Sequence, residues 1–239
     1  MARMTLDELV GQLRAAYGNT LRAIVLYGSA AAGEHIAKRS DYNVLVIVDA
    51  LGASQLTAAS AAARAWAEAG NPAPLTLTQQ EWRGSADIFP MEYADILERH
   101  RVLYGEPPFE GITVDRGDLR LQLEQEAMGK LIKMRQGALA AGNDGDRQLE
   151  LLAASVSPVM IVFRAFLRLH GVKPPTDNVA LTEQVASRAG FDGAPIIRVV
   201  RHVRGEAKLK SEDGNPVLAG YLQALEQLVG YLDTFHAAI

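Results

Sequence analysis

Two short polar segments near the N-terminus carry the residue types that phosphate and metal chemistry needs. Gly28 and Ser29 follow an apolar run, and after eleven intervening residues Asp41 and Asn43 precede another apolar run. A glycine–serine turn offers backbone N–H groups without a bulky side chain, so a phosphate can approach it closely. Residues two apart on a strand share a face, so Asp41 and Asn43 are expected to point together toward a cation. Mg²⁺ takes such oxygen ligands together with phosphate and water.

A third acidic side chain would complete a site of this kind, and the segment 85–95 supplies the candidates. We favour Glu92, because residues 91–96 are consistent with a short strand in which it has apolar neighbours. Asp87 is the second candidate and Asp95 is the third. A carboxylate in this place is suited to act as general base for an acceptor hydroxyl.

Basic residues supply further candidates for contact with phosphate. Lys38 and Arg39 lie between the two polar pairs, where they either meet the phosphates or remain solvated. One long predicted helix carries four more cations, which either line a cleft or form a solvated face: Arg120, Lys130, Lys133 and Arg135.

Hydrophobic periodicity predicts the elements that position these residues. A helix is expected over 5–17, where Thr5 and Glu8 fit a capping box at its start. The remaining elements of the first half are expected at 21–27 and 42–48 (strands), 54–69 (helix), and 75–78 and 91–96 (strands).

A Gly/Pro segment at 104–108 marks the expected domain boundary, beyond which the helical period dominates. We therefore expect an α+β protein with a mixed-sheet domain over 1–107 and a helical bundle domain over 108–239. Helices of the bundle are expected at 118–141, 149–170, 179–189, 194–205 and 216–237.

The segment from Gly28 to Asn43 resembles the DNA polymerase β-like nucleotidyltransferase superfamily, especially its small bacterial members and the aminoglycoside nucleotidyltransferases. Gly28 and Ser29 match the family's Gly-Ser pair, and Asp41 matches the first carboxylate of its Asp-x-Asp pattern. Ser40 and the apolar strand after the pair fit as well. The resemblance covers residues 5–105 and implies a nucleotidyltransferase fold, with the active site in the cleft between the sheet domain and the helical domain.

The resemblance implies transfer of a nucleoside monophosphate from an NTP, with ATP as first choice, to a hydroxyl acceptor in the presence of Mg²⁺. Asp41, Asn43 and Glu92 are the implied catalytic and metal-binding residues. Gly28, Ser29, Lys38 and Arg39 are the implied nucleotide-binding residues. The acceptor is a small antibiotic-like molecule, a metabolite or a protein side chain.

Asn43 departs from the family pattern, which has an acid at this position. An amide oxygen can still bind Mg²⁺, but the missing charge should weaken at least one metal site. The first alternative is therefore a catalytically impaired pseudoenzyme that acts by binding nucleotide or protein. A second alternative is an RNA-binding or RNA-cleaving helical module of the HEPN type, which Arg164 and His170 resemble in their spacing.

Composition limits the classes of partner. The net charge is −4, which argues against a broad nucleic-acid surface. The chain has no cysteine, so disulfides and thiolate metal sites are excluded. The N-terminal residues lack the apolar core of a signal peptide, and we find no apolar run close to the ~18–20 residues of a membrane span. We expect a cytoplasmic protein without membrane or nucleic-acid partners, and leave a homodimer open.

Overall fold

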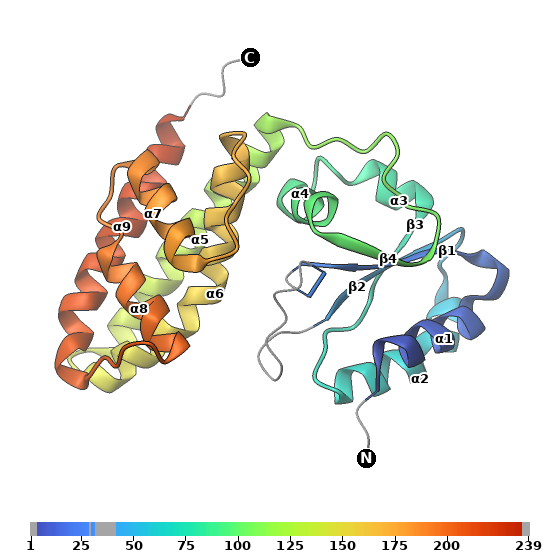
Figure 1. The fold of residues 1–239 in the computed structure, drawn as a ribbon, viewed down its shortest axis with the longest axis horizontal. Helices are drawn as coiled ribbons and strands as arrows, with labels where there is room; N and C mark the ends of the chain where they lie inside the picture. The colour runs from blue at the N-terminus through green and yellow to red at the C-terminus, as the bar shows by residue number, and fades with distance from the viewer. Residues whose placement is uncertain (1–3, 29, 32–41, 236–239) are drawn as a thin grey trace. The chain divides into compact units, whose positions relative to one another are not determined.

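The computed structural model describes residues 4–28, 30–31 and 42–235. The chain divides into a first unit, Met1–Val114, and a second unit, Asp115–Ile239. The first contains a sheet with helices and the second contains helices (Figure 1), so the expected α+β class is confirmed. The division falls after the Gly/Pro segment because Phe109, Ile112 and Val114 still pack against the core of the first unit.

The described part of the first unit is built on a four-stranded mixed sheet with the order β3-β2-β1-β4. β1 pairs antiparallel with both β2 and β4, whereas β2 and β3 are parallel. The strands span β1 Leu21–Tyr27, β2 Asn43–Val48, β3 Leu75–Thr78 and β4 His100–Gly105. The two central strands are buried on both faces, which explains their almost continuous apolar sequences.

Two pairs of helices cover the two faces of this sheet (Figure 1). On one face α1 (Leu6–Tyr17) and α2 (Ala53–Glu68) pack against alternate strand residues that include Ile24 and Val46. The capping box at the start of α1 is confirmed, since the Thr5 N–H donates to Glu8 at 2.7 Å. The short 3₁₀ turn η1 (Gly18–Thr20) leads from α1 into β1.

On the other face lie α3 (Gln79–Gly84) and α4 (Pro90–Glu98). Trp82 of α3 and Tyr93 of α4 stack with ring centroids 4.2 Å apart, and the Tyr93 hydroxyl donates to the Trp82 carbonyl at 2.7 Å. The Trp82 indole N–H donates to the carbonyl of Pro108 at 2.6 Å. These contacts fix α4 in position over the sheet.

The expected strand over 91–96 is wrong, because these residues belong to helix α4. Pro90 occupies the first turn of that helix, where a missing N–H costs nothing, and Glu92 follows in the same turn. The strand next to it in sequence is β4, which begins at His100 and was not expected.

Over residues 115–235, the second unit is a bundle of five helices with α6 (Gly145–Leu169) at its centre. α6 contacts each of the other four helices. The 3₁₀ turn η2 (Ser211–Asp213) lies between α8 and α9 in the chain. The helices span α5 Arg116–Ala141, α6 Gly145–Leu169, α7 Asn178–Ala189, α8 Ala194–Arg204 and α9 Gly214–Thr234.

α6 is long and apolar enough, by length and composition alone, to cross a membrane. This differs from the expectation that no segment of the chain has these properties. Twelve of its side chains are buried, Phe163 and Phe166 among them, and half of its most apolar window lies inside the structure. Its central place in the bundle accounts for its hydropathy.

Gly105 ends β4 at a point where the chain leaves no room for a side chain. Its φ is +78°, and a Cβ there would lie 1.8 Å from the carbonyl oxygen of Arg22. Gly111 has a φ of +76° but nothing within 4 Å of a Cβ. Both positions carry the conformational penalty of a left-handed residue, whereas only Gly105 adds a clash with backbone.

We predict that Gly111→Ala costs about 1 kcal/mol of stability and Gly105→Ala at least about 3 kcal/mol. The chain's two tryptophans, Trp66 and Trp82, are both buried in the first unit. Their fluorescence during urea unfolding therefore reports this unit alone. If the two variants unfold at the same urea concentration, the Arg22 carbonyl does not exclude a side chain at position 105.

Candidate functional site

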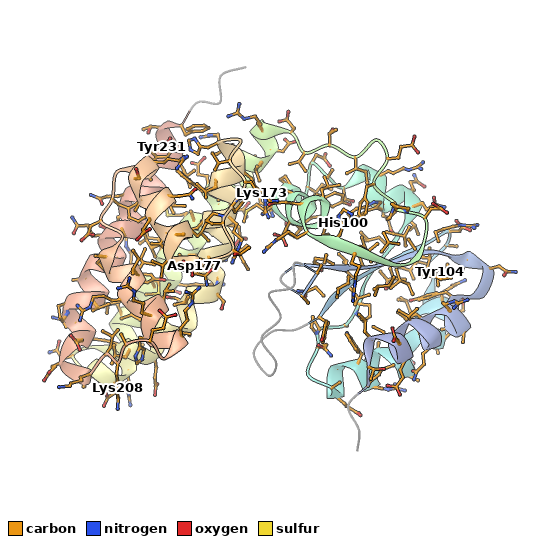
Figure 2. The ribbon with its side chains drawn as sticks, in the orientation of Figure 1. His100, Tyr104, Lys173, Asp177, Lys208 and Tyr231 are labelled. Atoms are coloured by element: carbon orange, nitrogen blue, oxygen red, sulfur yellow. The ribbon has the colours of Figure 1, made fainter. Side chains whose placement is uncertain are left out.

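Three strands meet at one end of the sheet, where two of the predicted site residues, Gly28 and Asn43, lie. β1 ends at Tyr27, whose register partners are Asn43, the first residue of β2, and His100, the first residue of β4. The end of one antiparallel strand necessarily lies beside the start of its neighbours. The register therefore brings together three side chains from distant parts of the sequence; Figure 2 labels His100 at this end.

Gly28 directly follows β1 and has a φ of +76°. Its N–H donates to the Arg99 carbonyl at 3.0 Å, and its carbonyl accepts the Ala31 N–H at 3.1 Å. The Gly28 N–H is thus already bonded and is not offered to a phosphate, contrary to expectation. Because Gly28 has no side chain, the side chains of Asn43 and Asp95 can approach its backbone closely. A Cβ on Gly28 would lie 3.4 Å from Asn43 Nδ2 and 3.8 Å from Asp95 Oδ2.

Asn43 faces the side of the sheet covered by α4. Leu45 and Ile47, two and four residues further along β2, belong to the core on that side. Alternation along the strand places Asn43 with them, half-buried beside Gly28. By the same alternation Asp41 is expected on this face, but it lies outside the described residues.

α4 directs two carboxylates toward this end of the sheet. Asp95 Oδ1 accepts from Arg99 Nη2 at 2.5 Å and from Arg99 Nε at 3.2 Å, in an ion pair one helical turn long. The Asp95 and Arg99 side chains are 25% and 15% exposed, so the pair is well shielded from water. Glu92 is three residues before Asp95 on the same helix face and is exposed.

The charges of both carboxylates affect the pKa of Tyr27. Burial raises the pKa of its phenol above the ordinary value, and the negative charges of Asp95 and then Glu92 raise this pKa further. A partly buried phenol beside two carboxylates stays protonated at neutral pH and remains a hydrogen-bond donor. Burial also raises the pKa of Tyr93 to about 12, with a contribution from the charge of Asp87.

The oxygen donors in this place suit a hard cation, although the described residues alone do not complete a site. Asp95 places a carboxylate oxygen beside Gly28, whereas the Asn43 atom nearest to Gly28 is its amide nitrogen. A carboxylate oxygen, and the oxygen of the same Asn43 amide, are ligand types that Mg²⁺ accepts. No cluster of three His, Asp or Glu side chains exists among the described residues.

Four of the predicted site residues, Ser29, Lys38, Arg39 and Asp41, lie outside the described residues. Of the others, Gly28 and Asn43 are brought together as expected.

The three acidic candidates have different surroundings. Asp95, the third choice from the sequence, lies beside Gly28 and Asn43. Glu92, the first choice, lies on the same face of α4, although the strand on which that choice rested does not exist. Asp87 precedes α4 and acts on Tyr93.

Sequence reasoning missed Arg99 and Tyr27. Arg99 stands four residues after Asp95, and an acid followed by a base at this spacing on a helix is a readable signal for an ion pair. Tyr27 stands next to the Gly-Ser pair, but its role depends on the pairing of β1 with β4, for which the sequence carries no local signal.

Arg164 and His170 make separate contacts within the second unit. The His170 ring lies among Phe166, Tyr231 and Phe235, and its Nε2 is 3.3 Å from the Tyr231 hydroxyl. Burial and the charges of Arg188 and Arg116 lower the pKa of His170, so it is neutral at pH 7. Arg164 Nη2 donates to Asn178 at 3.0 Å. These contacts account for both residues as parts of the bundle.

We predict that Asp95→Asn lowers the pKa of Tyr27, because it removes a negative charge that disfavours the phenolate and leaves the Arg99 cation less compensated. Glu92→Gln should lower it by less, and burial should keep it above the ordinary value in both variants. ¹³C-tyrosine NMR titration measures this pKa directly.

Asp87→Asn is the matched control for this titration. It should lower the pKa of Tyr93 and leave that of Tyr27 unchanged. A Tyr27 pKa that responds to Asp87 but not to Asp95 would contradict the arrangement of α4 over the strand end.

Comparison with known proteins agrees with this geometry at the level of fold. No protein-family model and no curated protein sequence matches the chain. The solved structure of spectinomycin adenyltransferase AAD(9) from Enterococcus faecialis, with ATP and spectinomycin, is similar to it. The TM-score is 0.58 and the identity 14%, over 96% of this chain and 98% of that chain. The chain therefore has a nucleotidyltransferase-like fold in which a mixed-sheet domain is followed by a helical domain.

Proposed function

We propose that this protein transfers a nucleoside monophosphate from an NTP to a hydroxyl acceptor. One observation carries the proposal: Gly28, Asn43 and Asp95 meet at one end of the sheet. Ser29 and Asp41 are one and two residues away in sequence from the first two of these. The site thus combines a glycine, whose missing side chain lets neighbouring groups approach closely, with side chains that carry oxygen ligands for a divalent cation.

Asp41 and Asn43 are the proposed metal ligands at the start of β2, with the triphosphate approaching over Gly28 and Ser29. Mg²⁺, when bound, offsets the negative charge of the triphosphate and of the leaving pyrophosphate. Lys38 and Arg39 precede Asp41 and are proposed to add positive charge near the phosphates. Because the N–H of Gly28 is bonded to Arg99, donors to the phosphates must come from residues after Gly28.

Glu92 and Asp95 have different proposed roles, because their surroundings differ. Asp95 is shielded and paired with Arg99, so it is suited to hold a fixed negative charge beside Asn43. Glu92 is exposed on the same helix face, where an acceptor hydroxyl can reach it. Glu92 would take the hydroxyl proton while the acceptor oxygen bonds to the α-phosphorus and the bond to the β-phosphate breaks, releasing pyrophosphate.

The donor and acceptor to test first follow from the structural neighbour. That protein is a spectinomycin adenyltransferase whose structure holds ATP and spectinomycin. We therefore propose ATP as the donor and a small polyhydroxylated, antibiotic-like compound as the acceptor. Spectinomycin heads the panel of acceptors, and metabolites and hydroxyl side chains of proteins complete it.

We predict that Asp41→Ala abolishes Mg²⁺-dependent binding of ATP in calorimetry. Glu92→Gln should leave the affinity for ATP unchanged and lower pyrophosphate release by about 10²- to 10⁴-fold, as expected for loss of a general base. Asp87→Asn is the matched control, since it removes a neighbouring carboxylate that faces Tyr93 instead. Wild-type ATP affinity in Asp41→Ala would refute the proposed site.

Asn43→Asp restores the acid that the family pattern has at this position. We predict that it raises the affinity for Mg²⁺ in the presence of ATP, because it adds a charged oxygen ligand beside Asp41. If wild-type protein binds ATP without turnover and the variant gains turnover, the natural protein is the impaired form. Weaker ATP binding in the variant, caused by repulsion from Asp95, would show that Asn43 is not a metal ligand.

A further inference from the structure

A cavity of 230 Å³ opens between α5 and α6 in the second unit. Its lining is mostly apolar, with two lysines on the α5 side. The lining residues are Lys130, Lys133 and Met134 from α5, and Leu151, Ala154, Ser155, Pro158 and Val159 from α6. All of them belong to one compact unit, so the cavity is a property of the bundle by itself.

The packing of the two helices explains the position of the cavity. At one end α5 and α6 are in tight contact, since a Cβ on Gly137 would lie 2.4 Å from the Leu151 side chain. The helices run antiparallel, so residues before Gly137 face residues after Leu151. There Pro158 stands inside α6, and the small side chain of Ala154 leaves space in front of it.

Pro158 leaves one backbone carbonyl of a cavity-lining residue without its helical hydrogen bond. A proline has no N–H, so the carbonyl of Ala154, four residues earlier, receives no helical hydrogen bond. Both residues line the cavity. The hydroxyl of Ser155 is engaged elsewhere, because it donates to the Leu152 carbonyl at 2.7 Å and lies 2.8 Å from the Tyr221 hydroxyl. The Ala154 carbonyl is thus suited to accept from a ligand.

The lysines give the cavity its charge. Lys130 Nζ is 2.5 Å from Glu126, so its charge is compensated. Lys133 is exposed and has neither an ion pair nor a hydrogen bond to any residue that the structure describes. The rim of an apolar cavity therefore carries one uncompensated cation, which favours a ligand with an anionic group.

We propose that this cavity binds a small single-ring or branched apolar compound that carries one hydrogen-bond donor and one carboxylate or similar anion. The apolar walls take the body, the Ala154 carbonyl takes the donor, and Lys133 pairs with the anion. The proposal is independent of the proposed transferase activity, because no residue of the sheet unit takes part.

The test uses para-aminobenzoate, which has a ring, an amino group and a carboxylate, without nucleotide present. The full-length protein is labelled at its methionine methyl groups. Met134 lines the cavity, whereas Met160 is buried in the same unit and does not. We expect a saturable shift of the Met134 resonance and none of the Met160 resonance.

Two analogues and two variants separate the contributions. Benzoate lacks the donor and should bind about two- to tenfold more weakly. Lys133→Gln should weaken binding of para-aminobenzoate by about two- to fivefold and leave that of the uncharged para-aminobenzamide unchanged. Lys208→Gln removes a lysine outside the cavity and should have no effect; Figure 2 labels Lys208 at the end of the bundle away from Tyr231.

Ala154→Phe fills the cavity and should abolish the Met134 shift. Ala140→Phe adds the same side chain to an exposed position outside the cavity and should preserve it. A change of the Met160 resonance in the free Ala154→Phe variant would show that the substitution disturbs the bundle itself. In that case the smaller substitution Ala154→Leu is used to fill the cavity. The proposal is overturned if Met134 does not respond, if the response survives the filling, or if Lys133→Gln weakens both ligands equally.

Discussion

Arg99 makes the two contacts on which the candidate site depends. Its carbonyl accepts the N–H of Gly28, and its guanidinium holds Asp95. One residue thus ties the end of β1 to the last turn of α4, and places a carboxylate beside a glycine from which it is separated by more than sixty residues of sequence. Because the ion pair is largely shielded, its partners are held more firmly than those of an exposed pair.

The other contacts of the first unit hold Gly28, Asn43 and Asp95 in place. The antiparallel register sets Asn43 and His100 on either side of Tyr27, and the stacked rings of Trp82 and Tyr93 hold α4 over the sheet. The apolar residues on both faces make β1 and β2 a rigid base. A site built on the ends of packed strands and one docked helix keeps its geometry better than a site built on loops.

The sequence was sufficient to predict what local signals determine. The capping box at Thr5, the buried strands and the long helices of the bundle follow from capping, periodicity and composition. The conformation of 91–96 was mistaken, because Met91 and Tyr93 alternate with polar residues as in a strand, whereas Pro90 at the first turn favours a helix. A short segment with both signals is decided by packing, here by the contact with Trp82.

The positions of the carboxylates could not be predicted for the same reason. Whether Asp87, Glu92 or Asp95 approaches Asn43 depends on how α4 lies over the sheet. That in turn depends on the stacking of Tyr93 on Trp82, which belongs to a different helix. Tyr27 likewise acquires its role, and Arg99 its bond to Gly28, through the pairing of β4 with β1. The ion pair of Arg99 with Asp95 was readable from its helical spacing. The sequence was enough to predict that a carboxylate from 85–95 belongs to the site. Which of the three carboxylates it is could be decided only from the tertiary structure.

The most direct measurement replaces Mg²⁺ with paramagnetic Mn²⁺ in a complex with ATP and follows the NMR signals of backbone and side-chain amides. A divalent ion bound at this end of the sheet should broaden the signals of Gly28 and of the Asn43 side chain strongly. It should spare Gly105, which lies at the other end of β1 beside Ala23. Broadening of Gly105 or of the helical unit, with Gly28 and Asn43 unchanged, would contradict a metal–nucleotide site at the strand ends.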